Sequence, residues 1–314
     1  MKKIFCLLFL SLSTFLFSYE PVKYTFDDGT YKRDVVVKKA PERAITLAQF
    51  MTETLLALGL EDKMIGTALM NGDILPEYKE AYDKIPVLEM GEGHSVSKEA
   101  FIAMGADFVS GWEQSISEES TGSLEELEER GVVPFVSNGL NNTATIETVY
   151  DDFRLLGKIF DVSDRAEKVV TQMQNTVKPI IEKTKNIPDN ERPKVLLYDS
   201  GESEAFVGGA GLPTNLIKLA GGKNIFSDLN VDYGVVSFES ILDRNPDIIV
   251  VTDYLSGLPA EKKIENFKKI PGMSELNAVK NNRIYIVNLV EMAPGVRNAK
   301  TVEKLYNMFY GENK

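Results

Sequence analysis

The sequence contains very few of the residues that build thiolate and imidazole sites. Its 314 residues include one cysteine and one histidine. The cysteine, Cys6, lies inside an apolar segment near the N-terminus. If that segment is removed, disulfides, cysteine nucleophiles and thiolate metal ligands are all excluded. Because His94 is the only imidazole, a dedicated zinc or manganese site is not expected, and we predict no metal site or cofactor of the chain's own.

The sequence also lacks an excess of positive charge. It has 47 acidic residues against 35 lysines and arginines, for a formal net charge of -12 at pH 7. Nucleic-acid binding and adhesion to an anionic membrane surface both need a basic face. We therefore expect no nucleic-acid partner. Beyond the N-terminal segment, no apolar run approaches the ~20 residues of a membrane-spanning helix.

Sequence patterns typical of enzymes are missing or weak. Neither a phosphate-binding G-x-x-x-x-G-K-[ST] motif nor a G-x-S-x-G nucleophile turn occurs. A serine–histidine pair would have to use His94. The glycine-rich residues 208–211 are weak as a dinucleotide fingerprint and fit a tight turn before a helix. These absences argue against an enzyme.

The N-terminus has the pattern of an export signal. Two lysines precede a continuous apolar and hydroxyl-containing run at residues 4–17, which matches a signal-peptide core and is short for a membrane span. We predict a cleaved signal peptide over residues 1–18. The exact cleavage site is not assigned, because signal cleavage sites usually have small residues at positions such as that of Leu16. Cys6 lacks the small preceding residues of a lipoprotein cleavage site. The prediction is a periplasmic, unlipidated protein, with an uncleaved anchor as the alternative.

Strand-like and helical segments alternate along the rest of the chain. Short aliphatic runs predict strands at residues 44–47, 64–69, 107–110, 132–136, 195–198, 248–252 and 284–288. Helices are predicted at residues 52–60, 97–104, 124–130, 212–220, 260–269 and 298–309. This alternation favours parallel strands joined by helical crossovers.

The alternation is interrupted by two amphipathic helices. Apolar residues recur at steps of three and four from Ile146 to Phe160, and again from Ala166 to Ile181. A helix of about twenty residues spans ~30 Å, which suits a rod between two lobes. We predict an α/β protein with two Rossmann-like lobes joined by one long helix and a ligand cleft between the lobes. The predicted division is an N-terminal lobe at 19–162, a connecting helix at 163–187 and a C-terminal lobe at 188–314.

A weak internal repeat relates the two predicted lobes. Residues 97–109 align with residues 237–249 without a gap, and the matches include Ser97 with Ser237, Glu99 with Glu239 and Asp107 with Asp247. In each segment a serine caps a short helix and a glutamate lies in its first turn. A first-turn carboxylate complements the helix dipole, which is reason enough for either glutamate alone. Equivalent glutamates in two lobes favour a shared function.

With these segments the chain resembles the periplasmic binding proteins of ABC importers for iron–siderophore complexes, haem and cobalamin. The order and spacing of several short segments carry the resemblance over nearly the whole mature chain: residues 41–46, 55–59, 91–107, 156–161, 221–225 and 236–250. One departure is the segment Met104-Gly-Ala before Asp107, where the family usually has a proline. The second lobe keeps that proline as Pro246.

The resemblance implies a binding protein that delivers a small-molecule metal chelate to the permease subunits of an ABC importer in the inner membrane. It implies that Glu99 and Glu239 face basic residues on the permease. It also implies that the long helix limits the lobes to a modest hinge motion. We expect a monomer. An exported interaction module without a transport role is the alternative.

Candidate ligand-binding residues follow the predicted strands. In open α/β sheets ligands bind beyond the carboxyl ends of strands, which selects Gln49, Met70, Asn71, Trp112, Tyr198, Tyr254 and Met292. Trp112 and Tyr254 could stack on a planar chelate, with packing as the alternative. Arg297 could pair with an anionic ligand or lie solvated at a helix start. His94 could touch the ligand or bind haem iron, or be a solvated loop residue.

The scarcity of histidine and cysteine bears on the ligand itself. A chain without its own metal ligands is expected to receive a metal inside an organic chelate. This favours a ferric siderophore first, with haem and cobalamin as alternatives.

Overall fold

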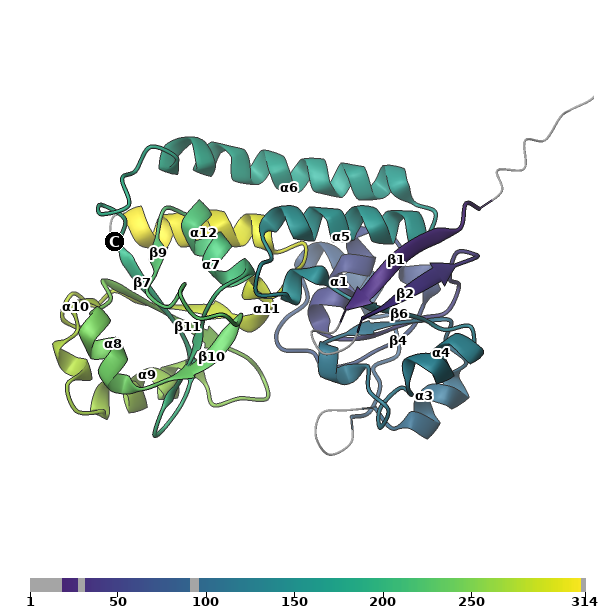
Figure 1. Cartoon of the computed structure of the whole chain (residues 1–314), viewed down its shortest axis with the longest axis horizontal. Helices are drawn as coiled ribbons and strands as arrows, with labels where there is room; N and C mark the ends of the chain where they lie inside the picture. The colour runs from purple at the N-terminus through teal and green to yellow at the C-terminus, as the bar shows by residue number, and fades with distance from the viewer. Residues whose placement is uncertain (1–18, 28–31, 91–95, 312–314) are drawn as a thin grey trace, which may run out of the picture.

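The computed structural model describes residues 19–27, 32–90 and 96–311. Two α/β lobes lie side by side, and one long helix runs across both of them (Figure 1). The predicted two-lobe α/β fold with a single long helix is confirmed. The predicted signal peptide and His94 lie outside the described residues. Within the described ranges, no helix combines the length and the apolar character needed to cross a membrane.

The N-terminal lobe is built on a four-stranded parallel sheet in the order β4-β3-β5-β6. Its strands are β3 (Ala44–Leu47), β4 (Met64–Thr67), β5 (Phe108–Gly111) and β6 (Val133–Val136). Its helices are α1 (Gln49–Ala57), α2 (Lys79–Tyr82), α3 (Lys98–Met104) and α4 (Leu124–Glu129). The strands are aliphatic and largely buried, as a sheet covered on both faces requires.

The C-terminal lobe has a six-stranded sheet in the order β10-β8-β7-β11-β12, with β9 also paired to β7. The parallel strands are β7 (Lys194–Ser200), β9 (Lys223–Asn224), β11 (Ile248–Asp253) and β12 (Ile284–Asn288). Strands β8 (Ala205–Gly208) and β10 (Tyr233–Val236) run antiparallel to their neighbours and were not predicted. Its helices are α7 (Leu212–Leu219), α8 (Phe238–Arg244), α9 (Ala260–Lys269), α10 (Asn277–Lys280) and α11 (Leu289–Met292).

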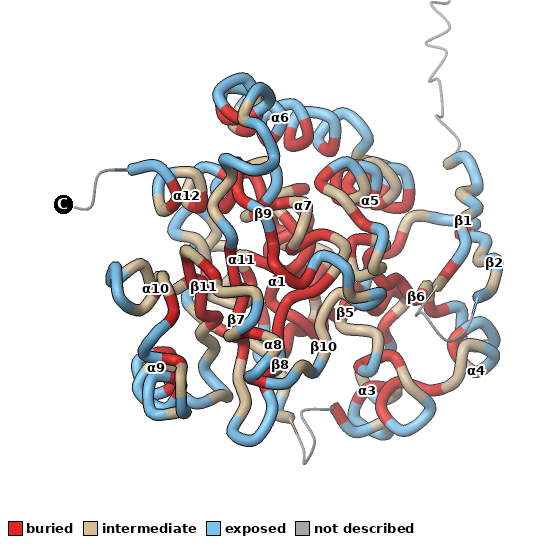
Figure 2. Tube along the Cα trace, turned by 60° about the vertical axis from the view of Figure 1, so that its left-hand side comes forward, coloured by how far each residue is buried: buried red, intermediate tan, exposed pale blue. Residues whose placement is uncertain are grey.

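The long helix α6 (Ser163–Thr184) packs on helices from both lobes. It contacts α5 (Ile146–Ile159) of the N-terminal lobe and α12 (Asn298–Tyr310) of the C-terminal lobe. Along the trace of α6 buried and exposed residues alternate, as expected for a helix with one buried face (Figure 2). The residues beneath it form one apolar cluster that includes Phe50 of the first lobe and Leu216 of the second. The two lobes therefore share a core.

An N-terminal hairpin precedes the first lobe and was not predicted. It pairs β1 (Val22–Asp27) with β2 (Lys32–Val37) in antiparallel register. Phe26 is buried in the core of the N-terminal lobe, and the Tyr24 hydroxyl donates a hydrogen bond to the carbonyl of Pro134 in β6. The hairpin thus covers part of the lobe next to edge strand β6.

An ion pair joins the lobes beneath the shared core. Arg297, which precedes α12, donates two hydrogen bonds of 2.5 and 2.6 Å to the carboxylate of Glu53 in α1. The Glu53 side chain is 1% exposed and that of Arg297 is 14% exposed. Arg297 also donates to the carbonyl of Asp73, and the amide of Leu75 donates to Glu53. The pair therefore fixes the loop after β4 as well as the two helices.

We expect Arg297→Met to lower the free energy of unfolding by about 3–5 kcal/mol, because it leaves the buried Glu53 carboxylate without its counter-charge. The double variant Glu53→Gln with Arg297→Met should recover much of that loss, since it removes the uncompensated charge. Denaturant unfolding of the purified variants, followed by circular dichroism, measures both. Equal losses in the single and double variants would contradict this account of the pair.

Candidate ligand site between the lobes

A cavity of about 530 Å³ lies between the lobes, at the carboxyl ends of strands from both sheets. Its walls are mainly apolar and aromatic, with a few polar groups, which is the usual make-up of a small-molecule site. Parallel strands direct their carboxyl ends to the same edge of a sheet, so each lobe presents one row of strand ends to the cavity.

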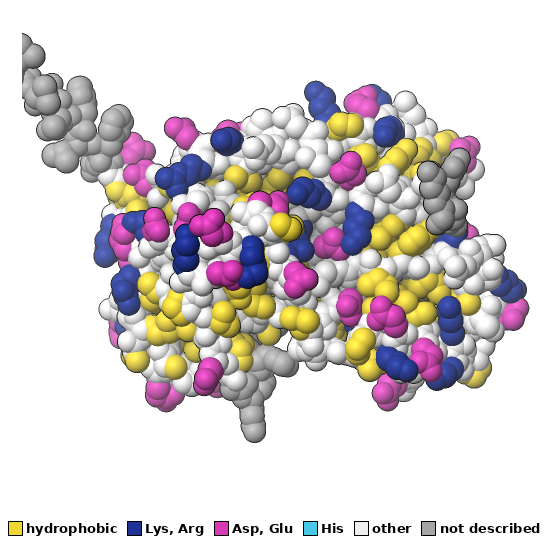
Figure 3. All heavy atoms as spheres, turned by 180° about the vertical axis from the view of Figure 1, so that it is seen from behind, with side chains coloured by type: hydrophobic (Ala, Val, Ile, Leu, Met, Phe, Trp, Pro, Cys, Tyr) yellow, Lys and Arg dark blue, Asp and Glu magenta, His cyan; other side chains and the backbone are white. Residues whose placement is uncertain are grey.

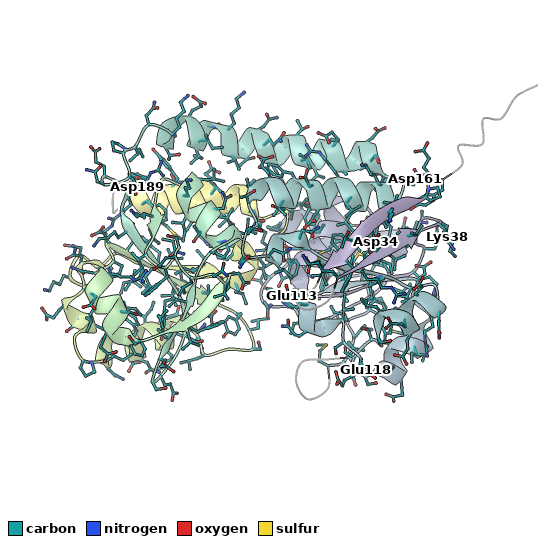
Figure 4. All side chains as sticks on the ribbon, viewed as in Figure 1. Asp34, Lys38, Glu113, Glu118, Asp161 and Asp189 are labelled. Atoms are coloured by element: carbon teal, nitrogen blue, oxygen red, sulfur yellow. The ribbon has the colours of Figure 1, made fainter. Side chains whose placement is uncertain are left out.

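The N-terminal lobe supplies Trp112, which directly follows β5. Its indole ring meets the Phe50 ring edge-on, with ring centres 4.7 Å apart. Phe50 is itself buried in the shared core, so the indole is held by packing on one side and borders the cavity on the other. Asn71 follows β4, and Gly139 and Leu140 follow β6, on the same wall. Glu113 lies near the boundary between the two lobes (Figure 4).

The C-terminal lobe supplies most of the lining residues, including two of the three carboxylates. Asp199 lies near the end of β7, Tyr254 follows β11, and Met292 ends α11. The antiparallel strands β8 and β10 add Phe206 and Tyr233, whose ring centres are 5.7 Å apart. Because β8 and β10 extend the sheet beyond its parallel part, they carry these two aromatic rings into the cavity wall.

Four of the residues selected from the sequence line the cavity: Asn71, Trp112, Tyr254 and Met292. The structure brings these four together from both lobes. The others that the structure describes lie elsewhere, and His94 lies outside the described residues.

Gln49 and Arg297 support the cavity from behind rather than lining it. The side-chain oxygen of Gln49 accepts hydrogen bonds from the backbone amides of Asn71 and Gly72, at 2.8 and 2.9 Å. Arg297 was considered either as a partner of an anionic ligand or as a solvated residue at a helix start; in the structure it does not line the cavity, and its guanidinium pairs with Glu53.

Tyr198 and Met70 are also outside the lining. The Tyr198 ring packs edge-on against Phe267 in the core of the C-terminal lobe, and its hydroxyl donates to the carbonyl of Gly201. The Met70 sulfur lies 3.9 Å from the hydroxyl of Thr67. Tyr198 is buried and Met70 is half-buried, and neither lines the cavity, so the geometry does not support their expected contact with a ligand.

The carboxylate of Asp199 is the centre of a polar network that sequence reasoning missed. Asp199 is 6% exposed and accepts hydrogen bonds from Thr252 at 2.5 Å, Ser200 at 2.9 Å and Tyr254 at 3.4 Å. Behind it, the Lys263 ammonium donates to the carbonyl of Thr252 and lies 4.1 Å from the centre of the Tyr254 ring. Burial lowers the pKa of Lys263. Burial raises the pKa of Tyr254, and the nearby Asp199 carboxylate raises it further.

Tyr233 and Asp232 form a second polar feature of the same wall. The Tyr233 hydroxyl oxygen is buried and has no hydrogen-bond partner among the described residues. Burial raises the pKa of Tyr233, with smaller contributions from Asp199 and Asp232. Burial also raises the pKa of the Asp232 carboxyl, which accepts a hydrogen bond from the amide of Tyr233 at 2.8 Å.

The charges that line the cavity have one sign. Glu113, Asp199 and Asp232 are carboxylates, and the lining formed by the described residues contains no lysine or arginine. The outer surface differs, because basic and acidic side chains are interspersed over the face in Figure 3. Within the described part of the chain, no group of three or more histidine, cysteine, aspartate or glutamate side chains is placed to hold a metal ion.

The N-terminal wall depends on a buried carboxylate behind it. Asp152 in α5 accepts hydrogen bonds from the Ser137 hydroxyl at 2.5 Å, the Asn138 side-chain amide at 2.9 Å and the Gly139 backbone amide at 3.3 Å. These bonds hold the turn that carries Gly139 and Leu140 to the cavity. Burial nevertheless raises the pKa of Asp152 to about 6, because the donors offset only part of the cost of removing the carboxylate from water.

We expect Asp152 to make stability depend on pH. Its pKa is about 6 in the folded chain against an ordinary 3.8, so its contribution is fully present below pH 3.8 and is lost as the pH rises through about 6. The loss should reach roughly 3 kcal/mol. It should appear as a fall in the free energy of unfolding between pH 4 and pH 7 that is absent in Asp152→Asn. Parallel pH profiles of wild type and variant would contradict the raised pKa.

Comparisons with known proteins agree with this geometry. A model of the periplasmic binding protein family matches residues 45–288. The crystal structure of a periplasmic binding protein from Veillonella parvula is 33% identical, with a TM-score of 0.83, and the match covers 93% of this chain and 99% of that one.

Two curated relatives add to this. An uncharacterized ABC transporter substrate-binding lipoprotein of Bacillus subtilis is 28% identical over 289 residues, which are 91% of this chain and 85% of the relative. The vitamin B12-binding protein of Vibrio parahaemolyticus is 24% identical over 250 residues, which are 79% of this chain and 81% of the relative. The resemblance seen in the sequence is confirmed, and the chain belongs to the periplasmic binding protein family.

Proposed function

We propose that this chain is the substrate-binding protein of an ABC importer, and that it captures a metal chelate between its lobes and delivers it to the permease. The observation that carries the proposal is the aromatic cavity at the strand ends of two lobes, in a chain of this family. The Bacillus subtilis relative, which is named as an ABC transporter substrate-binding protein, supports the importer.

The negative charge of the side chains that line the cavity disfavours anionic metal chelates. Haem carries two propionates and ferric tris-catecholates are anionic, and both would bring negative charge against Glu113, Asp199 and Asp232. A ferric trihydroxamate has a neutral iron core and meets no such repulsion. We therefore propose a ferric siderophore of the hydroxamate class as the cargo, with its organic face against Trp112.

Cobalamin is the second candidate. The specific observation in its favour is the relative named as a vitamin B12-binding protein. The corrin rim of cobalamin carries amide groups rather than carboxylates, so it is also compatible with a cavity that contains acidic side chains and no basic ones.

The single tryptophan makes the ligand measurable. Trp112 is the only tryptophan of the chain and borders the cavity, so its fluorescence should report occupancy directly. We expect saturable quenching at submicromolar concentration by ferric desferrioxamine, and weak or no binding of haemin and of a ferric tris-catecholate. Cyanocobalamin is titrated in parallel, with calorimetry as a readout that does not depend on Trp112.

The four ligands separate the possible results. Tight binding of cyanocobalamin alone would replace the siderophore by the second candidate. Tightest binding of haemin or of the tris-catecholate would overturn the charge argument. No calorimetric signal with any of the four would contradict the proposal that the cargo is a metal chelate.

The two repeat-related glutamates have equivalent settings in the two lobes. Glu99 lies in the first turn of α3 and Glu239 in the first turn of α8, and both are exposed. The preceding serines, Ser97 and Ser237, each accept a hydrogen bond of 3.2 Å from a backbone amide of their helix. This shared setting supports our proposal that both glutamates dock on basic residues of the permease.

We expect the double variant Glu99→Ala with Glu239→Ala to keep wild-type ligand affinity and to lose most of its transport in a reconstituted importer. Each exposed ion pair is worth only ~0–1 kcal/mol, so each single variant should have a smaller effect than the pair. Glu261→Ala, at an exposed first-turn glutamate of α9, is the matched control. Undiminished transport by the double variant would refute the docking role.

Export remains part of the proposal. The Bacillus subtilis relative is named a lipoprotein, so it gives no support to the prediction that this chain is unlipidated. Cleavage after residue 18 and the absence of a lipid stay predictions, because Cys6 and the predicted signal lie outside the described residues. The monomeric state also stays a prediction.

A further inference from the structure

We propose that the wall from the C-terminal lobe contains a subsite for a positively charged group of the ligand, of the ammonium type, formed by Asp232 and Asp199 with the rings of Tyr233 and Tyr254. This inference rests on the proposed function, because it names the part of the cargo that the cavity recognises.

The first step concerns the two carboxylates, which differ in how the protein compensates them. Asp199 receives three hydroxyl hydrogen bonds, and the ammonium of Lys263 lies behind Tyr254 in the same network. The Asp232 carboxylate is compensated by backbone amides, its own and that of Tyr233 at 2.8 Å, and no lysine or arginine lines the cavity beside it. A half-buried carboxylate without a counter-charge is costly, and a cation arriving in the cavity would offset that cost.

The second step is that Lys263 cannot serve the ligand. Its side chain is buried, it does not line the cavity, and its ammonium is engaged with the carbonyl of Thr252 at 2.8 Å. Lys263 therefore offsets part of the negative charge of Asp199 without lining the cavity. Asp232 is left as the less compensated carboxylate. The cavity surface stays negative on this side.

The third step concerns the aromatic rings, which favour a cation over a neutral donor. Phe206 and Tyr233 lie 5.7 Å apart between ring centres, and Tyr254 completes this side of the cavity. Ring faces attract ammonium groups through their quadrupoles. The Tyr233 hydroxyl oxygen, which has no hydrogen-bond partner among the described residues, is a further acceptor in the same wall. An ammonium has three N–H donors and no acceptor, which suits carboxylates and a phenol oxygen.

The opposite wall has one carboxylate, Glu113, against two on the C-terminal side, so the subsite also favours one orientation of the ligand. The N-terminal lobe contributes the polar side chains of Asn71, Glu113, Gln114 and Ser115, and the apolar groups of Trp112, Leu69 and Leu140. The body of a chelate should lie against these apolar groups, with its cationic arm directed to the C-terminal lobe.

The test compares two ligands that differ in one charge. Ferric desferrioxamine B carries a single terminal ammonium on a neutral trihydroxamate, and N-acetylation removes that charge. By calorimetry the wild-type protein should bind the ammonium form about tenfold more tightly than the acetylated form, the size expected for one charge-assisted hydrogen bond. This comparison needs no variant, so it is independent of any folding defect.

Variants then assign the preference to the subsite. Asp232→Asn should lower affinity for the ammonium form about tenfold and affinity for the acetylated form far less, so that most of the preference disappears. Asp243→Asn, which removes an exposed carboxylate of α8 outside the cavity, is the matched control and should keep the preference.

The outcomes separate the two proposals. If the wild type binds both forms with equal affinity, the subsite is overturned. Binding of the hydroxamate would in that case still support the proposed function. Binding of neither form would overturn the subsite, and the four-ligand titration would then decide the proposed function on its own. A preference that survives in Asp232→Asn would remove that residue from the subsite.

Discussion

The apolar face of α6 packs against α5 of one lobe and α12 of the other, and the relative position of the two sheets follows from this packing. Because residues of both lobes belong to one cluster under the helix, the lobes cannot separate without exposing that core to water. The buried pair of Glu53 and Arg297 adds a directional contact at the same junction. We therefore expect lobe motion to be restricted to small rotations. No residue of α6 is among those that line the cavity.

This arrangement lets two separate sheets build one site. Each sheet directs the carboxyl ends of its strands to the cavity, but the walls differ in chemistry. The first lobe offers an indole held by Phe50, and the second offers carboxylates and phenols near Asp199. A ligand that bridges the lobes therefore meets the indole and one carboxylate, Glu113, on one side, and two carboxylates with tyrosine rings on the other.

The sequence predicts those parts of this arrangement that depend on local pattern. Trp112, Asn71 and Tyr254 were found because each follows a strand that its aliphatic run makes visible. Tyr198 was selected by the same rule, but side chains alternate along a strand, so Tyr198 packs into the core and the next residue, Asp199, reaches the cavity.

Other features depend on contacts that local pattern does not contain. Arg297 and Glu53 are 244 positions apart, and only the fold brings them together. Strands β8 and β10 have four residues each, too few for a clear alternation, so the ring of Phe206 was missed with them, while Tyr233 was considered only as a weak candidate. The hairpin of β1 and β2 does alternate exposed and less exposed positions, and that signal was present in the sequence.

The buried and half-buried carboxylates differ in how far the protein itself compensates their charge. Glu53 is compensated by a guanidinium, and Asp152 by three donors that leave its pKa raised to about 6. Both are satisfied inside the protein and hold elements in place. Asp199 is compensated in part, by hydroxyls and by Lys263, whereas Asp232 is compensated only by backbone amides. Since an uncompensated charge lowers stability, its persistence at the cavity wall is most simply explained by a partner that arrives with the ligand.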